Sequence, residues 1–560
     1  MSDSSEPSES ESILRSSAVM AAGTVVSRMT GFLRAGLLAW ALGPLLHADI
    51  FNLANTIPNM LYILLAGGVF NAVLVPQLVR AMKHDSDGGD AYTNRVLTLA
   101  ALFLGAVTVL LVLAAPWVMR PFLGGAWDSL PAQRESVIAF ARYCLPQVFF
   151  YGMFVLVGQI LNARGRFGPM MWAPIANNVI SVGVLTAYLL VYGTPSDLCG
   201  GFTSSQELLL GLGSTAGIVA QLLILLPYLR AAGFRYRPRY DFRDAGLGHT
   251  LRLGLWTVLF VVVNQLAYTV VARLAAGGTA EAALGTCSAA TQATGYTVYS
   301  TAFLIVMVPH SVITVSLATA ILPRLSAHAA SGDLRALSRT LVGALRSVLA
   351  VILPFAALMP VLARDLANVL LGHAATRESY GLYVPTLSLF GAGLVVFTLH
   401  YLMLRGFYAL EGTRTVFWIQ CAVAATNIVV AVVAVPRVSP LHTAPMLVGA
   451  YAASYAVGGL VSWLVLSRRL GGLGSPELVR YVVRLVLAVA VTTAVAFLIE
   501  RLARAEVGDR PHWLVSTALL VVVGGIAIAT YLTLARLLRL TEVSAIVGTV
   551  FGRLRGRARR

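Results

Sequence analysis

Residues 96–119 read VLTLAALFLGAVTVLLVLAAPWVM and contain no charged side chain. A membrane-spanning helix needs about 20 mostly apolar residues, so this stretch is long enough to cross a bilayer. The rest of the chain has a similar character, because 58% of its 560 residues are hydrophobic and only 12% are charged. Soluble domains carry about 25% charged residues. The composition therefore excludes water-soluble domains and predicts an integral membrane protein.

Working outward from this stretch, we find further windows of the same kind along the whole chain. Together they predict an all-α protein of about 14 transmembrane helices. The predicted spans are 18–42, 50–79, 96–119, 137–161, 170–192, 207–228, 251–274, 285–322, 340–361, 383–409, 416–436, 446–467, 483–500 and 513–535. The span at 285–322 is unusually long, and Pro309 is a candidate for a break within it.

The predicted spans divide the chain into five parts. Residues 1–17 are expected to form a disordered cytoplasmic tail, 18–230 an N-lobe of helices 1–6, and 251–467 a C-lobe of helices 7–12. Residues 483–535 hold helices 13 and 14, and 536–560 form a basic cytoplasmic tail.

An internal repeat supports the division into two six-helix lobes. Pro76 near the end of the second span matches Pro323 near the end of the eighth, and Asn178 matches Asn427 at nearly the same offset. Six spans separate the members of each pair. The two copies are therefore predicted to be related by an axis along the membrane normal, a common transporter design.

The net charge of +17 reflects topology rather than nucleic-acid binding, because the basic residues lie between apolar spans. Most of them fall in loops on the side of the N-terminus, which predicts that both termini are cytoplasmic. The first residues lack the basic start and cleavage site of a secretory signal. The basic loop 230–243 and the Arg-rich tail are expected to contact anionic membrane lipids.

The four cysteines are scattered, without metal-ligand spacing, and predict neither a disulfide framework nor a zinc site. No motif for a cofactor is present. The outer loops are short and their carboxylates occur singly, which argues against a membrane enzyme.

The first span carries two arginines at membrane depth, where each charge costs about 2.5–3.5 kcal/mol on insertion scales. At about 100° per residue, the two arginines share one helix face with small and hydroxyl residues. This face comprises Thr24, Ser27, Arg28, Gly31 and Arg34. Such a face is expected to line a water-filled cavity, although Arg34 could also reach the outer headgroups.

Two other spans carry polar stripes. Asp49, Asn52, Thr56 and Asn59 follow helical spacing in the second span and line the same predicted cavity, unless they only bond neighbouring helices. In the eighth span, hydroxyl and amide side chains supply neutral polar groups. The members of that span assigned to the site are Gln292 and Tyr296.

Two inward-facing guanidinium groups indicate an anionic ligand. Arginine grips phosphate oxygens with two parallel hydrogen bonds, and Arg28 and Arg34 lie about 9 Å apart along the helix, so that they could bracket a diphosphate. Asp49 is the only carboxylate found well inside a predicted span. We expect it to pair with Arg34 when the cavity is empty.

At these residues the chain resembles the MurJ (MviN) family of lipid II flippases, within the multidrug/oligosaccharidyl-lipid/polysaccharide exporter superfamily. The resemblance rests on the segments 27–34 (SRMTGFLR), 48–52 (ADIFN), 57–59 (IPN), 68–70 (GVF), 75–76 (VP), 160–167 (ILNARGRF) and 406–410 (GFYAL). It implies two lobes around a cationic cavity and a groove for the polyprenyl tail made by the last two helices. It also implies that Arg28, Arg34 and Asp49 bind the substrate.

Two departures from the family pattern concern charge. Where many relatives have arginines in the second helix, this chain has Tyr62 and Ile63, and an apolar residue near Leu304 replaces the arginine of the eighth helix. The resemblance implies a non-enzymatic transporter of lipid II in the bacterial cytoplasmic membrane, with cell-wall synthesis proteins as possible partners. Another polyprenyl-diphosphate-linked glycan, a non-transporting scaffold and a cation-coupled multidrug exporter are the alternatives. The last needs intramembrane carboxylates that the sequence does not offer.

Overall fold

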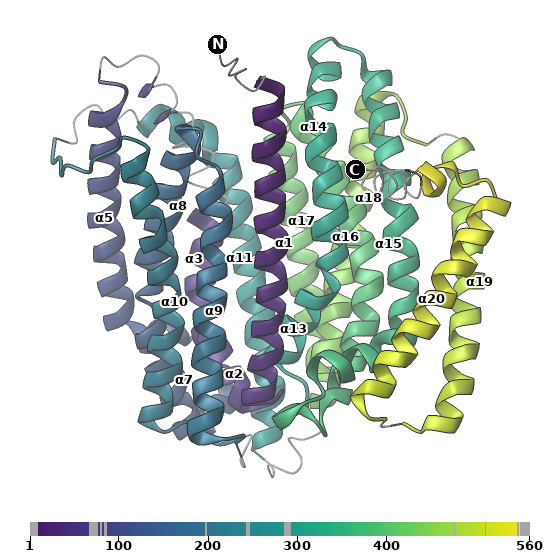
Figure 1. The fold of residues 1–560 in the computed structure, drawn as a ribbon, viewed down its shortest axis with the longest axis horizontal. Helices are drawn as coiled ribbons and strands as arrows, with labels where there is room; N and C mark the ends of the chain where they lie inside the picture. The colour runs from purple at the N-terminus through teal and green to yellow at the C-terminus, as the bar shows by residue number, and fades with distance from the viewer. Residues whose placement is uncertain are drawn as a thin grey trace, which may run out of the picture. The chain divides into compact units, whose positions relative to one another are not determined.

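The computed structural model describes residues 9–65, 77–78, 81–82, 87–195, 199–241, 247–284, 293–474, 476–509, 511–545 and 548. Within these ranges, the backbone alone is described at 9–21, 24–25 and 247–254. The regular elements of the described residues are helices. They fall into two compact units, residues 1–287 and 288–560 (Figure 1).

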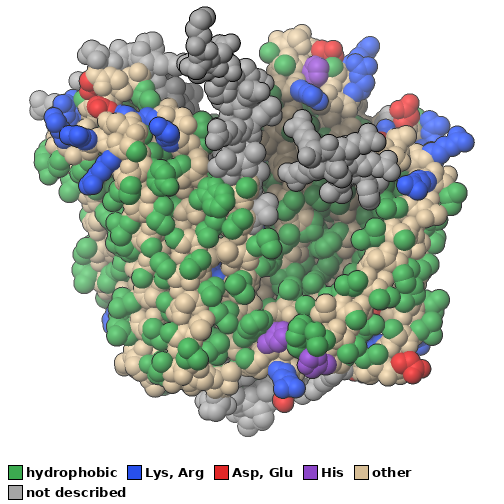
Figure 2. Space-filling view, viewed as in Figure 1, with side chains coloured by type: hydrophobic (Ala, Val, Ile, Leu, Met, Phe, Trp, Pro, Cys, Tyr) green, Lys and Arg blue, Asp and Glu red, His purple; other side chains and the backbone are tan. Residues whose placement is uncertain are grey.

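Twelve helices in the described part of the chain are long and apolar enough to cross a membrane. They coincide with the third to fourteenth predicted spans, which confirms an all-α multi-pass membrane fold. Hydrophobic side chains cover much of the flanks drawn in Figure 2. The first two predicted spans correspond to α1 and to the short pair α2 and α3, which are not among the twelve. The total of fourteen remains a prediction.

The first unit contains one long N-terminal helix, a set of short helices and five further long ones. Its elements are α1 (Glu9–Leu42), α2 (Leu46–Ala54), α3 (Thr56–Ile63), α5 (Asp90–Leu113), α6 (Ala115–Met119), η2 (Gly125–Ser129), α7 (Pro131–Cys144), α8 (Gln147–Ala163), α9 (Gly168–Tyr192), α10 (Ser204–Ala231) and α11 (Leu247–Ala283). An apolar core of α5, α8 and α10 side chains includes Phe154, Leu156 and Leu225.

The second unit is built on α15, which packs against several other long helices. Its elements are α13 (Tyr296–Val306), η3 (His310–Thr314), α14 (Val315–Ala330), α15 (Leu334–Leu371), η4 (Ala374–Thr376), η5 (Tyr380–Leu382), α16 (Tyr383–Ala409), α17 (Thr413–Ala434), η6 (Val435–Arg437), η7 (Pro440–His442), α18 (Thr443–Leu470), α19 (Pro476–Val507) and α20 (Trp513–Leu537).

The second predicted span is not one helix over 50–79. It breaks at Asn55, between α2 and α3, and residues 66–76 lie outside the described residues. Pro58 has no backbone N–H, so it cannot continue the α-helical hydrogen-bond ladder across this point. The Asn55 side chain donates to the Phe51 carbonyl at 3.0 Å and covers one of the carbonyls left at the end of α2.

The break expected in the eighth span is confirmed. α13 ends at Val306, Met307 forms a turn, and a π-helical turn follows Pro309 before α14 begins. The second and eighth spans, which are equivalent in the predicted repeat, are thus both interrupted. The repeat itself stays a prediction, because Pro76 lies outside the described residues.

α11 packs within the first unit, although the repeat assigns it to the second lobe. The Thr279 hydroxyl donates a hydrogen bond to Asp49 of α2, and Gln265 donates to the Met60 carbonyl at 2.8 Å. Arg273 donates to the carbonyls of Arg120 and Pro121, both at 3.2 Å. The compact unit therefore extends to residue 287, beyond the predicted lobe boundary at 230.

Two expectations are wrong. α15 and α19 run past the predicted span ends at 361 and 500, so that Asp365 and Glu500 lie inside helices long enough to cross a membrane. Asp49 is therefore not the only such carboxylate.

The second wrong expectation concerns the cysteines, which were expected to form no disulfide framework. Cys199, in the loop before α10, is disulfide-bonded. Cys144 and Cys421 are free thiols, and Cys287 lies outside the described residues.

Candidate functional site

The predicted cationic face of α1 is partly covered by α9. Asn178 of α9 donates one hydrogen bond to the Ser27 carbonyl and one to the Thr30 hydroxyl, both at 3.0 Å. A Cβ at Gly23 would lie 2.8 Å from the indole nitrogen of Trp172, so only glycine permits this approach of the two helices. The small residues of α1 therefore serve helix packing.

The two arginines of α1 remain unpaired. Arg28 is exposed and Arg34 is half-buried. Neither guanidinium makes a hydrogen bond or ion pair with a described residue. The ion pairs found among the described residues all involve other arginines. An uncompensated charge at membrane depth is costly, and no described side chain compensates these two.

Arg34 belongs to a small polar and aromatic cluster formed by three helices. It interacts electrostatically with Tyr151 of α8. The Tyr151 hydroxyl donates to Oδ1 of Asn59 in α3 at 3.3 Å, and the Tyr151 ring lies 4.7 Å from the ring of Tyr62, centroid to centroid. We call Arg34, Asn59, Tyr62 and Tyr151 the Arg34 cluster. It combines one cation, one amide and two aromatic faces.

A hydrogen-bonded group fixes the helices that carry this cluster. Oδ1 of Asn55, at the break between α2 and α3, accepts from Nε2 of Gln147 at 3.2 Å and from the Ser214 hydroxyl at 2.9 Å. Gln147 also donates to Ser214 at 3.1 Å. These contacts join the α2–α3 break to α8 and α10. Asn59 and Tyr151 are therefore positioned by a rigid helical scaffold rather than by a loop.

The structure gives Asp49 a hydrogen-bond partner outside the Arg34 cluster. Its side chain is buried, and Oδ2 accepts a hydrogen bond from the Thr279 hydroxyl of α11 at 2.6 Å. No ion pair joins Asp49 to Arg34, both of which are described. Two residues before Asp49, the His47 ring stacks on the Phe202 ring, with 3.6 Å between the ring centroids. In this structure the aspartate ties α2 to α11.

The remaining predicted site residues have different surroundings. Thr56 is buried and donates to the Asn52 carbonyl at 3.0 Å, within one helical turn, while Asn52 is half-buried and Asn59 exposed. The Ser27 side chain is half-buried, and that of Thr24 is not described. Tyr296 is buried in the second unit, and Gln292 lies outside the described residues.

Sequence reasoning missed the two tyrosines of the Arg34 cluster. In the sequence Tyr62 stands out only as a departure from the family pattern, and Tyr151 lies in an apolar stretch that is typical of a packed helix. Asn59 and Tyr62 are three residues apart, so both side chains lie on one face of α3. This spacing is the sequence signal that could have assigned Tyr62 to the same site as Asn59.

The geometry on α1, α3 and α8 can be compared with known proteins. The family model described as "Lipid II flippase MurJ" matches residues 38–523. The chain belongs to this family. A probable lipid II flippase MurJ of Rhizobium meliloti (strain 1021) is 27% identical over 490 residues, covering 87% of this chain and 86% of the relative. A lipid II flippase MurJ of Burkholderia cenocepacia is 26% identical over 403 residues, covering 70% and 72%.

Solved structures agree with the fold. A lipid II flippase MurJ in an inward closed conformation aligns with a TM-score of 0.69 at 16% identity, covering 93% of this chain and 98% of that one. An inward-facing multidrug resistance MATE family transporter of the MOP superfamily aligns with a TM-score of 0.63 at 16% identity, covering 79% and 94%. Family and fold are those of transporters rather than of enzymes.

Proposed function

We propose that this protein is a lipid II flippase that carries the undecaprenyl-diphosphate-linked disaccharide-peptide from the inner to the outer leaflet. The observation that carries the proposal is the pair of unpaired guanidinium groups on α1, together with membership of a family described as lipid II flippases. Transport by alternating access would serve peptidoglycan synthesis in the cell wall.

The physical need for such a protein comes from the headgroup. Its sugars, peptide and diphosphate lose their hydration in hydrocarbon, which is too costly for unaided crossing. Arg28 and Arg34 offer bidentate donors to phosphate oxygens in place of water. Outward movement of an anion is favoured by an inside-negative potential, which contributes about 2.3 kcal/mol per charge per 100 mV.

The proposed location is the bacterial cytoplasmic membrane with both termini in the cytoplasm. The segment after α10 supports contact with anionic lipids on that side. Its backbone is fixed to α5 because the N–H of Arg237 donates to Asn94 at 2.7 Å and the N–H of Arg239 donates to Thr98 at 3.1 Å. Both arginine side chains stay exposed. The proposed role also makes cell-wall synthesis proteins the expected partners.

A related substrate is the second candidate. Tyr62 stands where many relatives have arginine, and its ring packs on Tyr151 beside Arg34. The Arg34 cluster thus holds less positive charge and more aromatic surface than the family pattern implies. Another polyprenyl-diphosphate-linked glycan, with a sugar that stacks on these rings, fits this feature.

The decisive experiment depletes the protein in its host and measures the lipid II accessible at the outer leaflet. Depletion is expected to abolish outer-leaflet lipid II, and wild-type protein is expected to restore it. Arg28→Ala and Arg34→Ala are expected to fail, whereas the exposed Arg142→Ala on α7 is the matched control and should succeed. Unchanged outer-leaflet lipid II after depletion would reject the function. Rescue by both α1 variants would reject the site and favour a scaffold role.

A further inference from the structure

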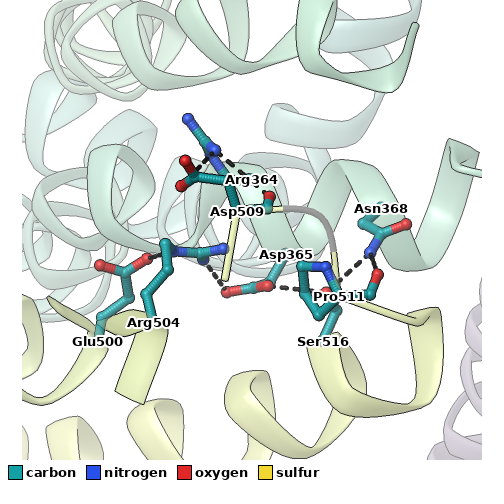
Figure 3. Close-up of polar contacts among 8 residues, drawn as sticks. All are labelled: Arg364, Asp365, Asn368, Glu500, Arg504, Asp509, Pro511 and Ser516. Atoms are coloured by element: carbon teal, nitrogen blue, oxygen red, sulfur yellow. Dashed lines mark hydrogen bonds and ion pairs between the residues drawn. The ribbon is translucent and has the colours of Figure 1, made fainter. Parts of the chain in front are cut away.

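A buried polar network fixes the start of α20 to the end of α15 in the second unit. Asp365 of α15 accepts from Arg504 of α19 and from the Ser516 hydroxyl of α20, both at 2.8 Å (Figure 3). Asn368 donates to Ser516 at 2.9 Å and to the Pro511 carbonyl at 3.0 Å. The segment that precedes α20 is therefore held in one position against α15.

A pocket of about 490 Å³ lies beside this network. Asn368 and Pro511 belong to both, so the network forms one wall of the pocket. The side chains that give the pocket its character are His373, Arg377, Glu378, His512 and Trp513. They come from the segment after α15 and from the residues that open α20.

The pocket contains one cation and one anion that are not paired with each other. The side chains of Arg377 and Glu378 are exposed, and neither makes a hydrogen bond or ion pair with a described residue. Two neighbouring opposite charges, both free to bind, fit a ligand that carries a positive and a negative group of its own.

The ends of two long helices reinforce this polarity. The C-terminal end of α15 at Leu371 carries partial negative charge, and the N-terminal end of α20 at Trp513 carries partial positive charge. The pocket lies between these ends. The α15 end favours an ammonium group and the α20 end favours a phosphate, and Glu378 and Arg377 add one charge of each required sign to the same pocket.

The pocket also lies at a membrane surface, because both α15 and α20 are long and apolar enough to span the bilayer and both end there. Trp513 is 40% exposed, as is typical of residues at the boundary between lipid and water. Leu514 and Val515 follow it and are also exposed. They extend an apolar surface from the pocket into the depth of the bilayer, where acyl chains lie.

We propose that this pocket binds the headgroup of a zwitterionic aminophospholipid, with the phosphate on Arg377 and the primary amine on Glu378, while the acyl chains lie along α20. Its headgroup contacts, Arg377 and Glu378, are distinct from Arg28 and Arg34, the residues proposed to bind lipid II. It makes one bilayer lipid a bound component of the second unit.

The test uses the full-length protein in nanodiscs that contain equal amounts of phosphatidylethanolamine and phosphatidylglycerol, followed by native mass spectrometry of the released complex. The two lipids share the phosphate, but only the first carries an amine. We expect one retained phosphatidylethanolamine, preferred over phosphatidylglycerol by about fivefold, the size of one exposed charge-assisted contact. Excess glycerophosphoethanolamine should displace it if the headgroup supplies the recognition.

Two substitutions separate the contacts. Glu378→Gln is expected to abolish the preference for the amine, and Arg377→Gln to lower retention of both lipids. The exposed Glu506→Gln on α19 and Arg335→Gln on α15 are the matched controls and should retain the wild-type preference. Equal retention of the two lipids by the wild type, or an unchanged preference in Glu378→Gln, would overturn the proposal. Displacement by inorganic phosphate alone would show a simple phosphate site and would also overturn it.

Discussion

Arg28 and Arg34 are the residues on which the proposed function depends. A guanidinium in a membrane helix is tolerated when it is paired or when it faces water, and neither of these groups has a partner among the described residues. A similar energetic cost is avoided at Arg504, which pairs with Asp365 and Glu500. The binding role proposed for Arg28 and Arg34 rests on this contrast with a paired arginine.

Replacing the arginines with lysine tests how the anion is held. Arg34→Lys keeps the charge but loses the planar fork, and one lost charge-assisted hydrogen bond lowers transport by about tenfold or more. Initial rates of lipid II transport in proteoliposomes are the measurement. Arg142→Lys on α7 should change little. Full activity in Arg34→Lys would mean that charge alone, without bidentate geometry, is sufficient.

Tyr62 offers a gain-of-charge test. Tyr62→Arg adds a cation to the Arg34 cluster. We expect tighter binding of a polyprenyl diphosphate, by about fivefold, and a steeper loss of binding as salt rises. Tyr62→Leu, which adds no charge, should not tighten binding. A salt dependence identical to that of the wild type would contradict a diphosphate bound beside Arg34.

At the residue scale, the sequence pointed to the charged side chains more clearly than to the contacts of the aromatic ones. Arg28 and Arg34 stand out because a charge in an apolar span has few explanations. Tyr151 does not stand out, since an aromatic residue in such a span usually packs in the interior. The burial of Asp49 against Thr279 also escaped prediction, because the partner lies on α11, which is distant in the sequence.

At the scale of elements, α15 is the support of the α19–α20 pair. Near one end, Asp365 joins Arg504 and Ser516. Near the other end, Arg346 pairs with Glu542 at 2.6 Å, and the Tyr481 hydroxyl donates to the Arg346 carbonyl at 2.8 Å. In between, small side chains such as Ala496 and Ala527 pack tightly. Polar contacts at both ends and close packing in the middle fix the pair to one helix.

Asp365 is expected to contribute most of the polar part of this attachment. Asp365→Ala removes one partner of a buried ion pair and should lower the free energy of unfolding by about 3–5 kcal/mol. Asp128→Ala, which removes a largely exposed ion pair with Arg134, should cost at most about 1 kcal/mol. Unfolding by denaturant in detergent micelles measures both. Equal effects would show that the Asp365 network is not energetically special.

The segment after α10 should respond to acid. The hydrogen bond from Arg95 lowers the pKa of Asp241 below its ordinary value of 3.8. Because the folded-state pKa is the lower one, this contact stabilises the attached segment above the ordinary value and is lost as the pH falls through the folded value. A spin label at Tyr240→Cys should gain mobility in that range. Asp241→Asn should give the mobile spectrum already at pH 7, and a label insensitive to both changes would contradict the assignment.

Helix positions were predictable and helix ends were not. Apolar length located the twelve long helices, whereas the break at Asn55 depends on contacts with Gln147 and Ser214 that no local pattern reveals. The predicted ends of α15 and α19 were too early, because hydropathy falls at a charged residue even when a partner neutralises it. Asp365 and Arg504 are such a pair.

At the scale of the whole molecule, the chain forms two compact units, residues 1–287 and 288–560. α11 packs in the first unit through Thr279, Gln265 and Arg273, whereas the predicted repeat counts it with the second lobe, and the lobe bounds stay a prediction. A sequence repeat records the order of the helices, but it does not record which neighbours each helix packs against. The unit boundary therefore had to come from the structure.

The orientation in the membrane can be tested with introduced cysteines. We expect Glu506→Cys, near the end of α19, to react from outside the cell with a membrane-impermeant maleimide. Arg335→Cys, at the start of α15, should react only after permeabilisation. Both positions are exposed. The disulfide at Cys199 agrees with this topology, because its loop is predicted to face the oxidising exterior. The reverse labelling pattern would invert the predicted topology.

The double attachment of α19 and α20 has a mechanical consequence. A helix held at one end can slide along its neighbour like a piston, but here a slip by one turn would have to break the contacts of Asp365 and Arg346 at the same moment. Axial slippage is thereby blocked, and only tilting or rolling together with α15 remains open. A displacement of α15 along its axis is therefore expected to carry α19 and α20 with it.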